Sequence, residues 1–564
     1  MKMTGAQSLL KILEEQDIKV IFGYPGGAVL PIYDALLENQ NVRHVLTRNE
    51  QGAAHAASGY ARITGRAGVC LATSGPGATN LVTGIATAYM DSVPLVAITG
   101  QVATPMIGTD AFQEVDITGI TMPITKHNYL VKDARELPRV VAEAFHIANT
   151  GRPGPVLIDI PRDVAEATID YEGPISINLR GYKPTVKGHK SQIKKAIRMI
   201  QDAQKPAILA GGGIMFAEAS EELQKLSELL GAPVATTLNG LGVFPETSRL
   251  GLGMVGMHGR PAANYAISNC DLLISLGVRF GDRATGSLKK FAKNAKVIHV
   301  DIDPAEIGKN VPVEMPIVGD ARSIVSEILK EMEPQRNDQW VDQILEWKQK
   351  HPMRKQYGSG DNLKPQLILE TLGNLTRHKA IVATDVGQHQ MWTAQHYGFD
   401  RPRSFVSSGG LGTMGYGLPA AVGAQMADPE ALVCCVTGDG SFQMNLPEMA
   451  TAMEQGLPIK IILMNNSALS LVKQLQHFQC GERYCSIDFT ANPDFGMLAR
   501  AYGVEALKIE TNEEIEPVLR QALENGKMTL VECMVSAREM VYPFVPGKKG
   551  LDEMVVFRKE GNDE

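Results

Sequence analysis

The sequence predicts an α/β protein of three domains, each built on a doubly wound parallel sheet. Three observations predict this fold class. Short β-branched runs alternate with amphipathic segments of helix length, two polar stretches divide the chain, and one segment near the start is echoed near the end. At about 150 residues per domain, a chain of 564 residues suits three large domains or four ordinary ones.

The expected strands are apolar on both faces and are followed by glycine, which is typical of buried parallel strands. They lie at 69–73, 95–99, 156–160, 207–210, 272–276, 297–300, 433–437 and 459–464. The first twenty residues instead predict an amphipathic helix, with Leu9, Leu10 and Leu13 on one face and acidic residues on another. Because acidic residues interrupt this segment and no small-residue cleavage site follows, we do not expect a signal peptide.

Two stretches have the composition of linkers. Residues 171–190 carry prolines and basic residues with weak periodicity, and residues 333–362 are strongly charged and polar. These stretches predict an N-terminal domain (1–180), a central domain (190–335), a third domain (365–540) and a C-terminal tail (541–564), and each domain has an ordinary size.

The composition excludes several classes of protein. Apolar residues make up 44% and charged residues 21%, so the chain is neither disordered nor collagen-like nor a disulfide scaffold. A net charge of −7 gives no basic surface for nucleic acid, and no run approaches the ~18 apolar residues of a membrane span. Cys480 and Cys485 could be metal ligands, but two thiols without further ligands favour incidental cysteines. We therefore expect a cytoplasmic protein that binds neither nucleic acid nor a membrane.

An internal echo links the first and third predicted domains. Residues 69–94 read VCLATSGPGATNLVTGIATAYMDSVP, and residues 433–458 read VCCVTGDGSFQMNLPEMATAMEQGLP. Allowing a shift of one residue, both run from a strand through a Gly-x-Gly turn and a helix with Ala-Thr-Ala to a proline before another strand. Chance similarity between two α/β segments is the alternative. Two like domains would form a cleft between them, and ligands commonly bind in such clefts.

The third domain carries a candidate phosphate and metal motif. Gly438-Asp439-Gly440 follows an expected strand, and Asn465-Asn466 ends the next strand after 24 intervening residues. Glycines around an acid expose backbone N–H groups to a phosphate, while the carboxylate can bind a hard cation. Asp439 and the amide oxygen of Asn466 suit Mg²⁺ shared with a diphosphate. This spacing matches the signature of thiamine-diphosphate-dependent enzymes.

Two other glycine clusters are weaker candidates. Gly410, Gly412 and Gly415 fit the GxGxxG dinucleotide fingerprint, but no strand ends cleanly at the first glycine. Residues 211–213 are three glycines between an expected strand and helix of the central domain. They could bind a nucleotide phosphate or could form a tight structural turn.

Over nearly its full length the chain resembles the large, catalytic subunit of acetohydroxyacid synthase (acetolactate synthase). The matching segments are FGYPGGAVLPIYDAL, RNEQGAAHAASGYAR, ATSGPGATNL, IGTDAFQE, TKHNYLV, GRPGPVLIDIPRD, GMHG, GVRFGDRATG, HVDIDPAEIGKN, DVGQHQMW, SSGGLGTMGYGLPAA and GDGSFQMN. The resemblance implies pyrimidine-binding, central FAD-binding and diphosphate-binding domains, in that order. It also implies a homodimer or homotetramer with the cofactor between the first domain of one subunit and the third of another, and a possible small regulatory subunit.

The resemblance assigns the catalytic and thiamine diphosphate residues. Glu50 would share a proton with N1′ of the aminopyrimidine ring, Gln113 would hydrogen-bond near the reacting centre, and the Gly27 backbone N–H would face its oxygen. Without this context, Glu50 would be interpreted as an ordinary acid at a helix start. The implied contacts of the cofactor are Glu50, Val386, Gly387, Gln388, His389, Gly412, Met414, Gly438, Asp439, Gly440, Ser441, Asn466, Ala468 and Leu469, with Asp439, Asn466 and Ala468 also holding Mg²⁺.

The resemblance further implies decarboxylation of pyruvate and transfer to a second 2-ketoacid, either pyruvate or 2-ketobutyrate, in branched-chain amino acid biosynthesis. Phe112, Met257 and Leu475 would line the second-substrate pocket, and Arg283 would hold its carboxylate. FAD in this family does no net redox work. Its implied contacts here are Arg152, Gly211, Gly212, His258, Gly277, Arg279, Asp301, Ile302, Gly319 and Asp320.

Two departures from the family pattern affect these expectations. Gly281 stands where the biosynthetic enzymes usually carry Asp, which bears on flavin binding. Leu475 stands where they carry a Trp that favours 2-ketobutyrate, so we expect mainly acetolactate as product. A catabolic FAD-free synthase, a pyruvate oxidase, a decarboxylase and a non-catalytic cofactor-binding partner remain as alternatives. Glyoxylate carboligase is disfavoured because it lacks the glutamate that Glu50 supplies.

Overall fold

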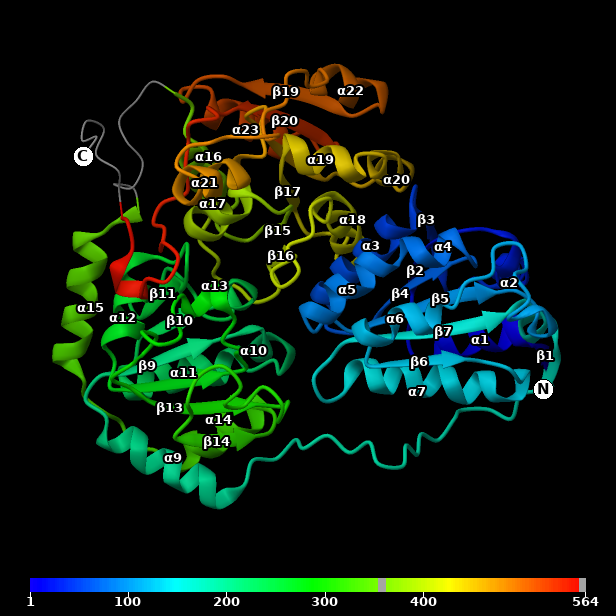
Figure 1. Ribbon diagram of the computed structural model, residues 1–564, viewed down its shortest axis with the longest axis horizontal. Helices are drawn as coiled ribbons and strands as arrows, with labels where there is room; N and C mark the ends of the chain where they lie inside the picture. The colour runs from blue at the N-terminus through cyan, green and yellow to red at the C-terminus, as the bar shows by residue number, and fades with distance from the viewer. Residues whose placement is uncertain (354–361, 557–564) are drawn as a thin grey trace.

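The computed structural model describes residues 1–353 and 362–556. Within these residues the chain forms three six-stranded parallel sheets and one two-stranded antiparallel ribbon. Figure 1 shows the N-terminal domain in blue and cyan, the central domain in green and the third domain in yellow to orange. Alternate residues of a strand enter different apolar cores, as with Cys70 and Leu71, so each face of the sheet is covered. The predicted fold class is therefore confirmed.

The N-terminal sheet has the strand order β3-β2-β4-β5-β7-β6. Its strands are β2 (Val20–Tyr24), β3 (Arg43–Leu46), β4 (Gly68–Ala72), β5 (Leu95–Gln101), β6 (His127–Leu130) and β7 (Pro155–Pro161). Its helices are α1 (Gly5–Glu15), α2 (Leu30–Glu38), α3 (Glu50–Thr64), α4 (Pro76–Asn80), α5 (Val82–Met90), α6 (Ile117–Thr121), α7 (Leu137–Asn149) and α8 (Arg162–Glu166). The expected N-terminal helix is α1, which Thr4 caps. No pattern in the sequence predicted the ribbon between β1 (Lys2–Thr4) and β8 (Thr168–Asp170).

The third sheet repeats that topology. Its order is β16-β15-β17-β18-β20-β19, which is the same 2-1-3-4-6-5 order when the strands of each domain are numbered from one. The strands are β15 (Ile381–Thr384), β16 (Phe405–Ser407), β17 (Val433–Gly438), β18 (Lys460–Asn465), β19 (Glu505–Ile509) and β20 (Thr529–Met534). The helices are α16 (Pro365–Leu375), α17 (Gln388–His396), α18 (Gly417–Ala427), α19 (Asp439–Asn445), α20 (Glu448–Glu454), α21 (Ser470–Gln479), α22 (Phe495–Ala501) and α23 (Ile515–Glu524). The internal echo thus reflects two like domains.

The central sheet has the order β11-β10-β9-β12-β13-β14. Numbered from one within the domain, this is 3-2-1-4-5-6, the order of dinucleotide-binding doubly wound sheets. Its strands are β9 (Pro206–Ala210), β10 (Val234–Thr236), β11 (Gly251–Met254), β12 (Leu272–Leu276), β13 (Lys296–Asp301) and β14 (Met315–Val318). Its helices are α9 (Lys190–Asp202), α10 (Gly212–Phe216), α11 (Ser220–Leu230), α12 (Pro261–Asn269), α13 (Asp282–Thr285) and α14 (Ala321–Glu331). All eight strands predicted from the sequence are present, within one or two residues at their ends.

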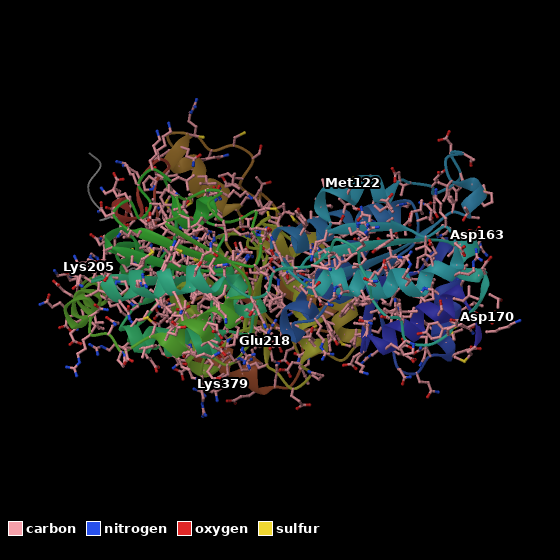
Figure 2. All side chains as sticks on the ribbon, turned by 90° about the horizontal axis from the view of Figure 1, so that it is seen from below. Met122, Asp163, Asp170, Lys205, Glu218 and Lys379 are labelled. Carbon is pink, nitrogen blue, oxygen red and sulfur yellow. The ribbon has the colours of Figure 1, made fainter. Side chains whose placement is uncertain are left out.

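The two predicted linkers have different outcomes. Residues 171–189 contain no helix or strand and run from the N-terminal to the central domain along the lower edge in Figure 1. Figure 2 shows Asp170, where this stretch begins, and Lys205 of the central domain at opposite ends of the molecule. The linker prediction for 333–362 is wrong over α15 (Asp338–Lys350). Trp340 of α15 is buried and donates to the carbonyl of Pro206, so this charged helix has an apolar face. Residues 354–361 lie outside the described residues.

The C-terminal segment packs on the central domain as far as the structure describes it. Phe544 and Leu551 are each 1% exposed, and the Val545 N–H donates to the carbonyl of Met257 at 2.8 Å. Residues 541–556 are therefore ordered, because Val545, Leu551 and Met554 complete an apolar core of the central domain. No helix in the described part of the chain combines the length and hydropathy that a membrane crossing requires.

The N-terminal and third domains meet through α3 and α18, whose backbones approach closely. A Cβ on Gly423 would lie 1.8 Å from the carbonyl oxygen of Ala56, and one on Gly59 would lie 2.2 Å from that of Ala420. Both obstacles are backbone atoms of buried helices, so they cannot move aside as a flexible side chain could. This contact fixes the helix that begins with Glu50 against the third domain.

We expect Gly423→Ala to destabilise the protein by roughly 1–3 kcal/mol or more, because the added methyl group forces the two helices apart. Thermal unfolding followed by circular dichroism measures the change. Gly547→Ala is the matched control, since a Cβ there meets nothing within 4 Å, and it should leave the midpoint unchanged. Equal midpoints for the two variants would contradict the close helix packing.

Candidate active site

The N-terminal domain gathers the predicted catalytic residues at the carboxyl edge of its sheet. Asn49 caps α3 by accepting from the N–H of Gln51 at 2.8 Å, which makes Glu50 the first residue of the helix. Glu50 is only 8% exposed, and one carboxylate oxygen accepts from the side chain of Asn80 at 2.9 Å. A Cβ on Gly77 would lie 3.2 Å from the other oxygen, so glycine keeps that oxygen accessible.

The loops around Glu50 supply the other two predicted residues. Thr73, directly after β4, accepts from the N–H of Ala28 at 3.3 Å and lies against Gly26, so the Gly27 turn is held beside this strand end. A Cβ on Gly27 would meet nothing within 4 Å, which leaves its backbone open. Gln113 has φ +60° and packs over Gly75. Glu50, Gly27 and Gln113 therefore surround one strand end.

The third domain brings together the predicted metal ligands. Asp439 begins α19 and is 1% exposed, and the N–H of Asn466 is among the backbone groups that act on its carboxylate. Burial raises the pKa of Asp439, while a 2.7 Å hydrogen bond from Asn492 opposes that rise. Asn466 accepts from the N–H of Ala468 at 3.2 Å. One carboxylate, one amide oxygen and one backbone carbonyl form a set of hard oxygen donors that suits Mg²⁺.

A glycine-lined cradle adjoins these oxygens. His389 is buried, and a Cβ on Gly387 or Gly438 would lie 2.7 or 2.8 Å from its ring. Burial lowers the pKa of His389 to about 3, so the ring is neutral. Among the described residues its Nε2 has no hydrogen-bond partner. A buried polar atom of this kind suits a hydrogen bond to a ligand such as a diphosphate.

The remaining predicted diphosphate contacts lie around this cradle, but the side chain of Gln388 is bonded elsewhere. Ser441 donates to the carbonyl of Val386 at 3.1 Å, and a Cβ on Gly412 would lie 3.8 Å from the Val386 side chain. Gly440 and Leu469 are neighbours, since a Cβ on the glycine would lie 2.9 Å from the leucine side chain. The side chain of Gln388 instead donates to Gln474 and to the carbonyl of Glu539. Met414 is half-buried on the loop that carries Gly412.

The predicted flavin residues of the central domain gather around its topological switch point, where the ligand crevice of a doubly wound sheet is expected. The predicted flavin residues follow the carboxyl ends of four strands, namely β9 (Gly211, Gly212), β12 (Gly277, Arg279), β13 (Ile302) and β14 (Gly319, Asp320), with Asp301 ending β13, while His258 lies four residues after β11. Gly211 and Gly213 donate to the carbonyls of Leu276 and Gly277, and added Cβ atoms on them would clash with Gly277. Residues 211–213 therefore form a tight turn packed against Gly277. Phosphate binding at this turn stays a prediction.

Charged groups line the same crevice. Arg152 of the N-terminal domain pairs with Glu306 at 2.6 Å and Asp303 at 3.2 Å, and Arg279 donates to the carbonyl of Met90. Burial raises the pKa of Asp301 to about 6. The ring of His258 lies 5.5 Å from that of Phe544 in a tilted arrangement, and burial lowers the pKa of His258 to about 4. The crevice thus lies where the N-terminal and central domains meet.

Comparison with known proteins assigns the family. Three models of thiamine pyrophosphate enzymes match in order: the N-terminal TPP-binding domain at 3–120, the central domain at 193–328 and the C-terminal TPP-binding domain at 385–533. The acetolactate synthase of Mycobacterium leprae is 49% identical, with 99% of this chain and 91% of that protein covered. The chain belongs to the acetolactate synthase family.

Other members of this family give the same picture. The probable acetolactate synthase large subunit of Methanocaldococcus jannaschii is 49% identical over 96% of this chain and 94% of its own length. The acetolactate synthase large subunit of Haemophilus influenzae is 46% identical over 99% of both chains. The resemblance stated from the motifs is thus confirmed, and all three domain models belong to thiamine-dependent enzymes.

The predicted substrate residues of this acetolactate synthase family member come from three domains. The Arg283 guanidinium lies 3.5 Å from the sulfur of Met257, and the Met257 N–H donates to the Arg283 carbonyl at 2.8 Å. Leu475 lies half-buried on α21. Phe112 is 86% exposed on the loop that carries Gln113. The structure therefore brings Met257 and Arg283 together. Phe112 is exposed to solvent and is not brought to them.

Sequence reasoning missed several side chains that hold the predicted site residues in place. Asn80 and Thr73 both lie in the quoted segment ATSGPGATNL. The polar residues next to its two ends could have suggested them. Asn492 contacts Asp439 from the loop between α21 and α22. No spacing rule identifies it, because that loop has neither an expected strand nor a motif.

Proposed function

We propose that this chain is the catalytic subunit of an acetolactate synthase that joins two pyruvate molecules with release of CO₂. In this proposal it uses thiamine diphosphate, Mg²⁺ and a structural FAD. The observation that carries the proposal is the meeting of Asp439, Asn466 and the unpartnered His389 Nε2 around a glycine-lined cradle, in a chain of this family. The enzyme acts in branched-chain amino acid biosynthesis and lies in the cytoplasm.

Thiamine diphosphate, when bound, supplies the electron sink that lets CO₂ leave pyruvate. Glu50 shares a proton with the pyrimidine ring through the oxygen beside Gly77, while Asn80 fixes the other oxygen. Gln113 and the open Gly27 N–H donate hydrogen bonds to the oxygen on which negative charge develops. His389, neutral because it is buried, donates or accepts at the diphosphate without adding charge.

Mg²⁺ in this proposal is held by Asp439, Asn466 and the Ala468 carbonyl, with the Gly438–Gly440 turn, Ser441 and Leu469 around the diphosphate. Val386, Gly387, Gln388 and Gly412 border the same cradle, and Met414 supports the cofactor from the neighbouring loop. Gln388 contributes through its backbone, since its side chain is bonded to Gln474.

FAD fits the central crevice as a structural group. Glycine loops border it, two arginines reach it, and among the described residues the buried Thr236 Oγ1 and His299 Nδ1 have no hydrogen-bond partner. Gly281 is exposed, and a Cβ there meets nothing within 4 Å, so loss of the usual acid leaves the backbone of the crevice unobstructed. Arg283, with its side chain 69% exposed, binds the carboxylate of the second ketoacid.

The active enzyme is a homodimer or a homotetramer, with a small regulatory subunit as a further partner. Exposed apolar side chains around Phe112 support a partner copy there: Met106 is 48% exposed, Ile120 43% and Met122 69%. Figure 2 shows Met122 at the surface of the N-terminal domain. Several exposed apolar side chains on one segment favour a contact with another chain, and the partner's third domain would complete the site around Glu50.

Acetolactate formation by flavin-stripped protein tests this function. The assay contains pyruvate, thiamine diphosphate and Mg²⁺, with and without FAD. Product that depends on FAD supports a biosynthetic synthase, and product without FAD indicates the cofactor use of the catabolic branch. Reduction of bound flavin by pyruvate would instead indicate an oxidase, and the absence of product in both samples would contradict the proposed reaction.

We expect Leu475→Trp to shift the choice of second substrate toward 2-ketobutyrate by roughly 10- to 200-fold, because one methylene in an apolar pocket is worth about 1–3 kcal/mol. A competition assay with pyruvate and 2-ketobutyrate measures the product ratio. Gln479→Trp, an aromatic residue at the exposed end of the same helix, is the control and should leave the ratio unchanged. A strong preference for 2-ketobutyrate in the unmodified enzyme would contradict the role given to Leu475.

A further inference from the structure

A turn at the centre of the molecule joins all three domains through one carboxylate. Asp91 ends α5 and its side chain is fully buried. One of its oxygens accepts from the N–H of Gly410 at 2.7 Å and from the side chain of Asn239 at 2.8 Å. The other accepts from the N–H of Gly409 at 3.0 Å and from the Arg62 guanidinium at 2.6 Å. In Figure 1, α5 lies where the three coloured domains meet.

The buried ion pair gives this junction a single geometry. The Arg62 side chain is 2% exposed and lies over the ring of Tyr416 at 5.8 Å. Removing one partner of such a pair leaves an unpaired buried charge, which is strongly unfavourable. Asp91 therefore fixes the two backbone N–H groups it binds in the third domain.

Those N–H groups begin the loop that borders the proposed cofactor cradle. Gly409 and Gly410 lie two to five residues before Gly412 and Met414. A Cβ on Gly410 would lie 2.8 Å from the Asp91 carboxylate, and one on Gly409 would lie 2.3 Å from the side chain of Asn239. A second contact, 2.7 Å between the hydroxyls of Thr87 and Thr413, holds the same loop to α5. The glycines at 409 and 410 thus serve this close approach.

The same turn contacts the central crevice. The carbonyl of Met90 accepts from Arg279, and the hydroxyl of Ser92 accepts from Arg152 at 2.8 Å. Three consecutive residues, 90 to 92, therefore join two arginines of the crevice to the loop at 409–415. Any ligand that orders those arginines acts on a backbone segment that Asp91 connects to this loop.

We propose that the turn at residues 90–92 couples occupancy of the central crevice to the thiamine diphosphate loop, with Asp91 as the positioning residue. The inference rests on the proposed function, because it takes FAD as the crevice ligand. FAD orders Arg152 and Arg279, the arginines hold the turn, and Asp91 holds Gly409 and Gly410 so that the loop is set for the cofactor. A flavin without a redox role would in this way raise the affinity for thiamine diphosphate.

Coupling of this kind is a ratio of affinities and is reciprocal. In the wild-type chain we expect FAD to tighten thiamine diphosphate binding by about tenfold, within the range of typical allosteric couplings. Thiamine diphosphate should tighten FAD binding by the same factor. Asp91→Asn keeps the shape but removes the charge, so we expect it to bind FAD, to bind thiamine diphosphate about tenfold more weakly, and to show a coupling factor near one.

The experiment titrates full-length protein with thiamine diphosphate and Mg²⁺, with and without FAD, and follows intrinsic tryptophan fluorescence. Hydrogen exchange of the peptide that spans 408–416 is the second readout and needs no catalysis. FAD should slow this exchange in wild type and leave it unchanged in Asp91→Asn. Glu143→Gln is the matched control, because Glu143 is a buried carboxylate paired with Arg139 within the N-terminal domain, and it should keep the wild-type coupling.

Ser92→Gly is a second variant for the case in which Asp91→Asn does not fold, because it removes the hydroxyl that links Arg152 to the turn while glycine tolerates the φ of +57° at this position. It should retain FAD binding and weaken the coupling. If wild type binds both cofactors and both variants keep its coupling factor, the inference is overturned while the proposed function stands. If wild type binds neither FAD nor thiamine diphosphate, the proposed function itself is overturned.

Discussion

Replacing Glu50 with glutamine should reduce acetolactate formation by roughly 10²- to 10⁴-fold, the usual contribution of a positioned acid–base group. Glutamine has nearly the same shape and can keep the contact with Asn80 that now holds one carboxylate oxygen at 2.9 Å. It cannot share a proton with a ring nitrogen as a carboxyl can. The loss should therefore appear in kcat, and the affinity for thiamine diphosphate should fall much less.

Two measurements separate this outcome from a folding defect. Steady-state assays with pyruvate give kcat and KM, and exchange of the C2 proton of bound thiamine diphosphate with deuterium, followed by NMR, reports activation of the cofactor directly. Glu136→Gln, at an exposed glutamate of the same domain, is the control and should behave as wild type. A Glu50→Gln enzyme with unchanged proton exchange would remove Glu50 from the proposed mechanism.

Replacing Asn80 should reduce acetolactate formation, but by less than Glu50→Gln does. Its amide orients the Glu50 carboxylate from α4, so it acts through another residue. The carboxylate also lies close enough to Tyr33 that its charge contributes, after burial, to raising the pKa of that phenol. The N-terminal site is therefore a small network, in which the reacting group is held by neighbours that carry no motif of their own.

The architecture could be predicted from the sequence because its signals are local. Each buried strand is a largely apolar run and most end at or near a glycine, and the eight expected strands lie within one or two residues of β4, β5, β7, β9, β12, β13, β17 and β18. The echo at 69–94 and 433–458 anticipated a shared topology, which the identical strand orders of the two sheets bear out. Turn glycines and strand ends then place Asp439 and Asn466 at one edge without any long-range information.

What the sequence did not predict depends on contacts between distant segments. The helix α15 resembles a linker because most of its residues are charged or polar, and only packing identifies its apolar face around Trp340. The tail at 541–556 is ordered because Val545 and Leu551 join an apolar core of the central domain and Phe544 stacks on Phe478 of α21. Asn492 and Asp91 have ordinary neighbours in sequence, so their roles appear only when their hydrogen bonds are known.

Replacing Asp439 with asparagine should weaken Mg²⁺ binding by more than the roughly 10- to 100-fold that is typical of outer-shell changes, because it removes the one charge of the proposed ligand set. Asn492→Ala removes the hydrogen bond to that carboxylate and should cost roughly 10- to 100-fold. Glu430→Gln, at an exposed carboxylate of the same domain, is the matched control. Titration of Mg²⁺ against binding of thiamine diphosphate measures all three, and equal affinities for Asp439→Asn and the control would contradict the metal site.

The pH dependence of the same titration provides an independent check of Asp439. Burial raises the pKa of this carboxyl above its ordinary value, so the group retains its proton to a higher pH than an exposed aspartate. Since Mg²⁺ must displace that proton, affinity for the metal should fall as the pH is lowered through the raised pKa. Asn492→Ala removes a hydrogen bond that lowers this pKa, and the fall should therefore begin at a higher pH in that variant. In Asp439→Asn, which has no proton to displace at this position, the pH dependence should disappear.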